Sequence, residues 1–419
     1  MNPQSAKQGS SYGWVIVVAA FLITFITCGI NYSFGVFFLP ITHDFGWTRG
    51  MVSVMVLIAG LVYASTIPIC GILADRYGYR WVLAVATGCL SLGLILSSQI
   101  QSLWQLYVFN GVLIGLSISA SFAIPVALVA LWFSKRQGLA VGTATMGISL
   151  GTAVIPLLIT YLISSVGWRP TFLIAGIATG LICIPAALVM RQPPRREWPC
   201  VAEAGLPAQD KQEKPEMAPG EDPGLTLSEA IRTKEFWLLF VMFVLFLLSL
   251  GLVMLHVIPY AIDSGLSPIA AAGILTFVGI FGLAGRLISG LLSDRIGIKP
   301  VILFCLFLEA AIIIWVTFSK DMGVFYTFAA LFGIAYSGFV TMMVRITRYV
   351  FGPKALGSVF GFLMISDGIG FGVGPWLAGY IFDITGSYQV SLLSVAVGLV
   401  AAAAITLVIK PPRTVPSTG

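Results

Sequence analysis

Long apolar runs separated by short polar turns fill almost the whole chain. A helix needs about 20 mostly apolar residues to cross the hydrocarbon core of a bilayer, and twelve runs are long enough. The apolar positions in each run are continuous instead of alternating, which predicts membrane-spanning helices and not barrel strands. The runs lie at about 14–39, 50–73, 81–99, 103–130, 138–163, 168–190, 236–263, 268–291, 300–318, 323–350, 355–380 and 387–410.

Composition agrees with this pattern, because 58% of the 419 residues are hydrophobic and only 10% are charged. Soluble domains carry roughly 25% charged residues, so this chain lacks the side chains for a water-facing shell of ordinary size. We therefore expect an all-α integral membrane protein with 12 transmembrane helices. No short apolar run precedes a small-residue cleavage site, so we expect no signal peptide.

One long polar stretch, residues 191–234, interrupts the apolar runs and is rich in Pro, Glu and Lys. Such a composition cannot build a packed core. We interpret it as a cytoplasmic linker between two six-helix bundles, residues 1–190 and 235–419.

The distribution of Lys and Arg predicts the orientation. If the N-terminus is cytoplasmic, that side holds seventeen Lys and Arg residues, and the opposite loops hold only Arg49, Arg169 and Lys320. The positive-inside rule then places both termini in the cytoplasm. The formal charge of +6 is explained by this topology and by attraction to anionic lipid, so it requires no nucleic-acid partner.

The two halves of the chain repeat one another at a single offset. GILADRYGYRW at 71–81 and GLLSDRIGIKP at 290–300 are separated by 219 positions. The same shift superposes Pro40, Asp44 and Gly46 on Pro259, Asp263 and Gly265, and Gly142, Gly151, Pro156, Tyr161 and Gly167 on Gly361, Gly370, Pro375, Tyr380 and Gly386. Because three separate regions match at the same offset, we infer that the two halves of the chain are structural copies with the same orientation. Parallel six-helix repeats are an architecture of secondary transporters.

The repeated loops resemble the signature loops of the major facilitator superfamily, between the second and third helices and between the eighth and ninth. The resemblance implies the major facilitator fold, with two pseudo-symmetric bundles. We expect the loops to form a latch at the cytoplasmic face that holds one arrangement of the bundles. The alternative is a plain turn flanked by snorkelling cations. The latch would pair Asp75 with Arg76 or Arg80, and Asp294 with Arg295 or Lys299.

Arg286 is the most informative polar residue, because it lies in the apolar run TFVGIFGLAGRLISGLLSD. A charge inside the membrane is costly, and a guanidinium cannot lose its proton. Arg286 therefore requires an anion. That anion is either a substrate carboxylate or a fixed acid such as Asp367.

Further segments are similar to the monocarboxylate transporter family and to the related oxalate–formate antiporters. These are YGWVIVVAAFL at 12–22, NYSFGVFF at 31–38 and RTKEFWLLF at 232–240. The resemblance implies that Arg286 contacts the substrate carboxylate. Two positions depart from the animal carriers: Tyr32 replaces a lysine, and Gly282 replaces an aspartate. The usual proton-handling pair of that family is therefore missing.

Asn31 and Tyr32 resemble the first helix of the oxalate–formate antiporters, which implies that Tyr32 faces the substrate. Those antiporters hold a dianion with an additional lysine in the eleventh helix. Here that stretch reads FGFLMISDGIG and contains Asp367 instead. A second negative charge on the substrate would meet a carboxylate, so we expect a monocarboxylate such as L-lactate or pyruvate.

Three titratable residues are candidates for proton coupling. Asp367 lies near the middle of the eleventh predicted helix, and His256 and Asp263 lie in the seventh. Imidazole titrates in the physiological range, so His256 is a candidate for proton transfer and also for hydrogen bonding to the substrate. A structural role is equally compatible with its sequence position. Asp263 has Asp44 as its repeat counterpart, which favours a structural cap.

Smaller polar residues complete the predicted site. Tyr336 and its repeat counterpart Ser117 fall on the tenth and fourth helices, which the resemblance implies line the cavity. Packing is an equally good explanation of Tyr336. Glu309, in the ninth helix, is expected to be peripheral or paired at a helix surface. The cysteines lack metal or disulfide spacing and no phosphate-binding loop occurs, so we expect no metal, cofactor or nucleotide.

The sequence thus predicts a monomeric secondary transporter in a prokaryotic cytoplasmic membrane, which carries a small monocarboxylate together with a proton. Two alternatives remain open. One is a proton-independent carboxylate exchanger of the oxalate–formate type, favoured by Gly282. The other is a non-transporting membrane sensor. An enzyme is not expected, because no nucleophile–base pair is evident.

Overall fold

The computed structural model describes residues 3–133, 137–192 and 224–410, and the secondary structure within these ranges is helical. Twelve helical segments of the described ranges are long and apolar enough to cross a membrane. The predicted all-α fold with twelve spans is therefore confirmed. The helices extend beyond the predicted apolar runs at several ends, because helical hydrogen bonding continues past the hydrocarbon core. The first span, for example, covers Tyr12–Phe45.

The first half of the chain contains α1 Pro3–Tyr32, α2 Phe34–Phe45, α3 Arg49–Tyr77, α4 Tyr79–Ser97, α5 Leu103–Leu106, the π-helical η1 Tyr107–Ile114, α6 Gly115–Ser121, α7 Ala123–Trp132, α8 Gln137–Val166 and α9 Trp168–Val189. The second half contains α10 Leu227–Ile231, α11 Lys234–Asp263, α12 Pro268–Ile296, α13 Ile298–Thr317, α14 Met322–Phe351, α15 Leu356–Leu363, α16 Ile365–Thr385 and α17 Gln389–Val408.

Three of the spans are interrupted helices, which the apolar pattern did not predict. The first breaks at Ser33, whose hydroxyl donates to the Gly29 carbonyl at 2.5 Å. Such bonding back to the preceding turn bends helices. The fourth span contains the π-helical segment η1, and the eleventh breaks at Met364. Irregular backbone within a span is tolerated where protein covers it or where it lines a cavity, so we expect these breaks to lie away from lipid.

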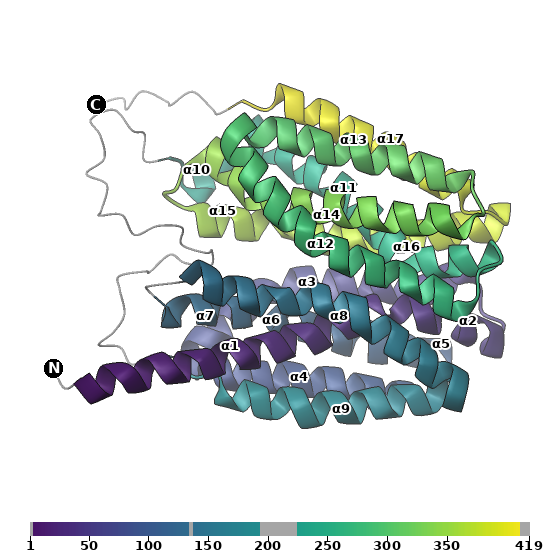
Figure 1. Ribbon diagram of the computed structural model, residues 1–419, viewed down its shortest axis with the longest axis horizontal. Helices are drawn as coiled ribbons and strands as arrows, with labels where there is room; N and C mark the ends of the chain where they lie inside the picture. The colour runs from purple at the N-terminus through teal and green to yellow at the C-terminus, as the bar shows by residue number, and fades with distance from the viewer. Residues whose placement is uncertain (1–2, 134–136, 193–223, 411–419) are drawn as a thin grey trace.

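The two halves lie side by side as separate groups of helices (Figure 1). Helices α1 to α9 occupy the lower half of the view, and α11 to α17 occupy the upper half. We call the end where α1 begins and α17 ends the proximal end, on the left of Figure 1. The opposite end, where α2 leads into α3, is the distal end.

Small residues allow the two groups to approach closely. Helix α3 packs on α16, α8 packs on α12, and α2 packs on α11. At the α3–α16 contact, a Cβ atom at Gly60 would collide with the Gly368 carbonyl oxygen, and a Cβ atom at Gly368 would collide with the Gly60 carbonyl. Glycine at these facing positions lets the backbones meet, as in other membrane helix pairs.

We expect Gly60→Ala to destabilise the protein, because the added methyl group would force these backbones apart. Overpacking of this kind costs roughly 1–3 kcal/mol. Gly88→Ala is the matched control, because a Cβ atom at Gly88 in α4 would meet open space. The control should retain or gain stability, since alanine favours a helix by up to about 1 kcal/mol. Thermal unfolding of both purified variants measures the difference, and equal melting temperatures would contradict the contact.

Candidate functional site

Arg286 lies on α12 at the interface between the two groups of helices. Its Nη1 atom points at the Thr145 carbonyl of α8, at 3.5 Å, and the side chain is half-buried. No carboxylate of the described residues lies within ion-pair distance of this guanidinium. The fixed salt bridge with Asp367, which the sequence left open, is therefore absent from the described part of the chain.

Two residues of α1 lie within electrostatic range of this cation. The Arg286 charge acts electrostatically on Cys28 and Tyr32 of α1. Tyr32 in turn lies within electrostatic range of Tyr336 on α14 and Asp367 on α16. Tyr32 thus lies within electrostatic range of three other predicted residues, Arg286, Tyr336 and Asp367, each on a different helix.

Asp367 has a partner that sequence reasoning missed. The Tyr63 hydroxyl of α3 lies within electrostatic range of the Asp367 carboxyl group, so this interaction links the two halves of the chain. One signal could have identified Tyr63: it is the repeat counterpart of Gly282, since the two are 219 positions apart. We call Tyr32, Tyr63, Arg286, Tyr336 and Asp367 the central group.

Gly282, one helical turn before Arg286, faces two unpartnered hydroxyl groups. A Cβ atom at this position would lie 2.8 Å from the Ser337 Oγ atom and 3.4 Å from the Tyr336 hydroxyl. Both hydroxyls are buried and lack a hydrogen-bond partner among the described residues. An unmade buried hydrogen bond costs roughly 1–3 kcal/mol, so a water or a substrate oxygen at this point would be stabilised.

Ser117 is fully buried in α6, and its hydroxyl has no hydrogen-bond partner in the described ranges. No described contact links it to Arg286. Glu309 was expected at the periphery or a helix surface, but its side chain is 0% exposed. It accepts a hydrogen bond from Ser249 of α11 at 2.9 Å, because α13 turns this acid toward α11. The predicted position of Glu309 at the periphery or at a helix surface was therefore wrong.

His256 and Asp263 belong to a second cluster, at the distal end. Arg49 of α3 pairs with Asp263 at 2.6 Å and donates to the Tyr388 hydroxyl at 2.7 Å. Asp383 accepts hydrogen bonds from the backbone N–H groups of Arg49 and Gly50, at 2.9 and 2.8 Å. We call Arg49, Asp263, Asp383 and Tyr388 the distal latch, because they join α3 to α11, α16 and the start of α17.

His256 supports this latch from the buried side. Its Nδ1 atom lies 3.0 Å from the Tyr388 hydroxyl, and its Nε2 atom lies 2.9 Å from the Pro375 carbonyl and 3.3 Å from Ser53. No described contact joins His256 to Arg286. Sequence reasoning noted Arg49 only as one of three cations outside, and it had no signal for Asp383 or Tyr388.

Arg49→Gln should therefore loosen the distal end. The substitution removes a charge-assisted hydrogen-bonded pair, which is worth roughly 1.5–3 kcal/mol, and a contact with the Phe382 ring at 3.9 Å. We expect amide hydrogen exchange at residues 46–53 and 383–388 to rise about tenfold.

Arg169→Gln provides a matched control for Arg49→Gln. Arg169 pairs with Asp44, the repeat counterpart of Asp263, at 3.5 Å, but both residues lie in the first half of the chain. That variant should leave exchange at residues 383–388 unchanged. An equal rise in both variants would mean that Arg49 does not hold the halves together.

The loop residues predicted as a cytoplasmic latch lie at the proximal end and do not bridge the two halves in the described ranges. Asp294 pairs with Arg345 of α14 at 2.5 Å, and not with Arg295 or Lys299 as expected. The Lys299 ammonium group donates instead to the Ile409 carbonyl. That expectation was wrong because α14 brings a deeper arginine past the end of α12.

The equivalent residues of the first half are partly described. The guanidinium groups of Arg76 and Arg80 lie over the neighbouring rings of Tyr77 and Trp81, at 5.4 and 4.7 Å from the ring centroids. The Asp75 side chain lies outside the described part of the structure, so its predicted pairing stays a prediction.

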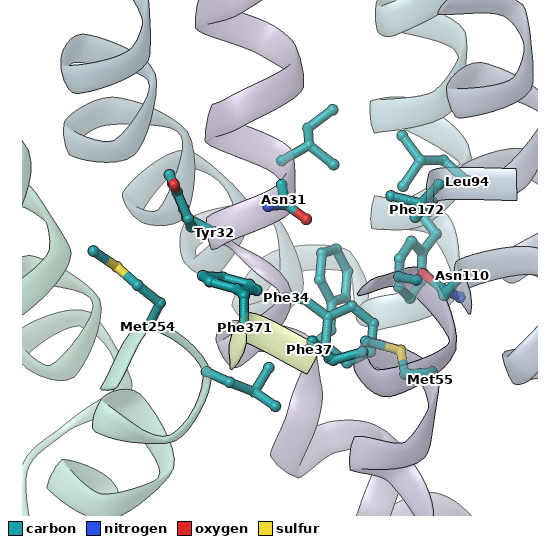
Figure 2. Close-up of a pocket in the computed structure, with 15 residues that line it drawn as sticks. Asn31, Tyr32, Phe34, Phe37, Met55, Leu94, Asn110, Phe172, Met254 and Phe371 are labelled. Carbon is teal, nitrogen blue, oxygen red and sulfur yellow. The ribbon is translucent and has the colours of Figure 1, made fainter. Parts of the chain in front are cut away.

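Asn31 and Tyr32 end α1, just before the break at Ser33. They point in opposite directions (Figure 2). The Tyr32 hydroxyl points away from Phe172 and Asn110, whereas the Asn31 side chain points toward them. Asn31, predicted to bind substrate, therefore lines a cavity beside the central group. Within the described ranges no cluster of three or more metal-ligating side chains occurs.

Comparison with known proteins places this geometry in a wider group. The family model for the Major Facilitator Superfamily matches residues 20–308 and 274–419. Among curated relatives, monocarboxylate transporter 12 of Mus musculus is 26% identical over 407 residues, covering 91% of this chain and 82% of that protein. Monocarboxylate transporter 6 of Homo sapiens is 25% identical over 398 residues, covering 92% and 78%. Monocarboxylate transporter 4 of Rattus norvegicus is 26% identical over 388 residues, covering 90% and 79%.

Solved structures share the fold. A bacterial homologue of the human lysosomal transporter Spinster, inward-facing and unoccupied, superposes with a TM-score of 0.72 at 18% identity, covering 95% of this chain and 97% of that one. A mutant of the nucleoside transporter NupG superposes with a TM-score of 0.73 at 13% identity, covering 95% and 99%. At such low identities these similarities describe the architecture alone.

Proposed function

We propose that this chain, which belongs to the Major Facilitator Superfamily, transports a small monocarboxylate together with a proton by alternating access. The observation that carries the proposal is Arg286, a permanent cation between the two halves without a carboxylate partner among the described residues. A cation held in this way within a membrane protein is costly unless an anion joins it. A mobile substrate carboxylate supplies that anion, and the named monocarboxylate transporters among the relatives support the substrate class.

Charge balance favours a single negative charge on the substrate. Arg286 is the one cation of the central group, and Asp367 is its acid. A dicarboxylate would place its second charge near the Asp367 carboxylate in a low-dielectric interior, where like charges repel strongly. A monocarboxylate such as L-lactate or pyruvate leaves one anion opposite one cation. Tyr336 and Ser337 then offer hydrogen bonds to the remaining oxygens of the substrate.

Asp367 is the proposed proton carrier. When Asp367 is ionised, its carboxylate can accept a hydrogen bond from the nearby Tyr63 hydroxyl across the two halves. Binding of a proton converts the carboxylate to the neutral acid and weakens this charge-assisted bond, since hydrogen bonds to ionised groups are about twice as strong as neutral ones. Proton binding thereby acts on a contact that must change when the halves move. The loaded centre then holds Arg286, the substrate anion and a neutral acid, with no net charge.

The distal latch suggests how access alternates. Arg49, Asp263, Asp383 and Tyr388 hold the distal ends of the two halves together, and we propose that this latch must break before substrate can enter from that side. Transporters with parallel repeats rock one bundle against the other around a fixed midplane site. The central group occupies that position in the proposed mechanism.

The test is uptake by purified protein in liposomes. Labelled L-lactate or pyruvate is added outside, with and without an inward proton gradient. Symport predicts uptake that rises with the gradient and falls when a protonophore is added. Uptake driven only by carboxylate preloaded inside would instead establish an exchanger, the alternative that Gly282 favours. Absence of uptake and exchange for a panel of small carboxylates would overturn the transport proposal.

A further inference from the structure

A cavity of about 50 Å³ lies beside the central group and shares Tyr32 with it. Most of its lining comes from the first half of the chain, including Asn31, Phe34 and Phe172. Met254 of α11 and Phe371 of α16 close it from the second half (Figure 2). The walls are mainly apolar, and only a few side-chain amides interrupt them. A void of this size between spans requires an occupant or a loss of packing contacts.

Asn110 places an unused hydrogen-bond acceptor at this cavity. Its side chain is 2% exposed, and its Nδ2 atom donates to the Ser97 Oγ atom at 2.7 Å. Ser97 already donates its own proton to the Gly93 carbonyl, at 2.6 Å, so it must accept from Asn110. This assignment of donor and acceptor fixes which end of the Asn110 amide is the NH2 group and which is the oxygen. The Asn110 Oδ1 atom is then buried without a hydrogen-bond partner among the described residues, on the side of the aromatic rings in Figure 2.

The backbone around Asn110 supports a built site. Asn110 lies within the π-helical segment η1, the one π-helical segment of the described chain. A π-helical turn costs stability relative to an α-helix and occurs frequently at functional sites. Asn31, on the other side of the cavity, also has a side-chain amide without a hydrogen bond to any described residue. Two amides therefore face the same apolar space from different spans.

The cavity lies next to the central group, on the side that faces the distal end. The Tyr32 ring lies 6.2 Å from the Phe371 ring, centroid to centroid, and both residues line the cavity. Phe371 follows Asp367 by one helical turn on α16, a rise of about 6 Å. A molecule whose carboxylate rests at Arg286 would therefore reach the cavity by extending past Tyr32 and Phe371.

We propose that this cavity is a subsite for the tail of a hydroxylated aliphatic monocarboxylate, with the substrate hydroxyl donating to Asn110 Oδ1. This inference rests on the proposed carboxylate transport and narrows its substrate class. The volume admits roughly three to five non-hydrogen atoms, since one water-sized group needs about 10–15 Å³ by this measure. A neutral hydroxyl fits better than an ammonium group, because a charge would be buried among apolar walls. Acids with a hydroxyl at the end of a short alkyl chain, such as 5-hydroxypentanoate, meet these requirements.

The experiment compares binding of 5-hydroxypentanoate and pentanoate to the purified full chain by isothermal titration calorimetry. The wild type should bind the hydroxy acid about tenfold more tightly, as expected for one recovered buried hydrogen bond. Asn110→Leu keeps the side-chain shape but removes the acceptor, and should reduce the preference to about one.

Ala59→Leu tests the cavity without touching Asn110. Ala59 lines the cavity from α3, so the larger side chain should fill it and weaken binding of both acids about tenfold relative to acetate. Leu61→Phe is the matched control, because Leu61 lies on the same helix, is 52% exposed and does not line the cavity. That variant should retain the tenfold preference.

The outcomes separate this subsite from the transport proposal. Lactate binding that depends on Arg286, combined with no hydroxy-acid preference in the wild type, would overturn the subsite alone. So would a preference that survives both Asn110→Leu and Ala59→Leu. A preference that depends on Asn110 but survives Arg286→Gln would support the subsite and contradict the carboxylate role of Arg286. Failure of every acid to bind the wild type would overturn both.

Discussion

Arg286→Gln will reduce specific monocarboxylate uptake by about a hundredfold or more while leaving the protein folded. The guanidinium is the one cation of the central group, and no described carboxylate depends on it for pairing. Its removal therefore leaves the substrate anion uncompensated at a poorly solvated site. Loss of one partner from a buried charge pair costs roughly 3–5 kcal/mol. Since about 1.4 kcal/mol corresponds to a factor of ten, the expected loss is about two to three and a half orders of magnitude.

The measurement is the initial rate of labelled pyruvate uptake into liposomes at a concentration below saturation. Arg286→Lys is a useful second variant to compare with Arg286→Gln. Lysine keeps the charge but lacks the planar guanidinium group that binds both carboxylate oxygens. We expect it to retain partial uptake. Arg348→Gln is the matched control, since Arg348 is exposed in the last turn of α14. Saturable uptake by Arg286→Gln within a few-fold of the wild type would contradict the assignment.

Asp367→Asn will separate substrate movement from proton movement. Asparagine has nearly the same shape and can still accept a hydrogen bond from Tyr63, but it cannot take up a proton. Wild-type uptake should rise as the external pH falls below the internal pH, because each substrate enters with a proton. The variant should lose this dependence and its ability to accumulate substrate. Exchange of labelled for unlabelled substrate at equal concentrations should persist, because that reaction requires no net proton transfer.

Tyr63→Phe gives the complementary comparison. It removes the hydroxyl that lies within electrostatic range of Asp367 but leaves the titratable carboxyl group in place. We expect that variant to retain proton-driven accumulation at a changed rate. If Asp367→Asn still accumulates substrate under a proton gradient, the carrier is another acid. If the wild type itself shows no proton dependence, the exchanger alternative replaces symport.

The amino-acid sequence by itself determined three kinds of feature. They depend on the length of the apolar runs, on the offset of the internal repeat and on the cost of burying a charge in the membrane. A run of about 20 apolar residues can satisfy its backbone in lipid only as a helix, so the twelve spans follow from the apolar runs alone. The constant offset between the two Asp-Arg loops established the repeat. Arg286 stood out because a charge within an apolar run is expensive wherever the helix packs. Each of these inferences uses the order of residue types along the chain and needs no contact between helices.

The tertiary structure decided which side chains meet across helices. Asp367 lies within electrostatic range of Tyr63, and Asp294 pairs with Arg345, because helix crossings brought together residues that are far apart in the sequence. The distal latch likewise unites Arg49 with acids from α11 and α16. Residue types within a span identify a polar group, but its partner depends on the rotation and register of the neighbouring helix. Those are set by packing of small residues such as Gly60 against Gly368, which the apolar pattern does not encode.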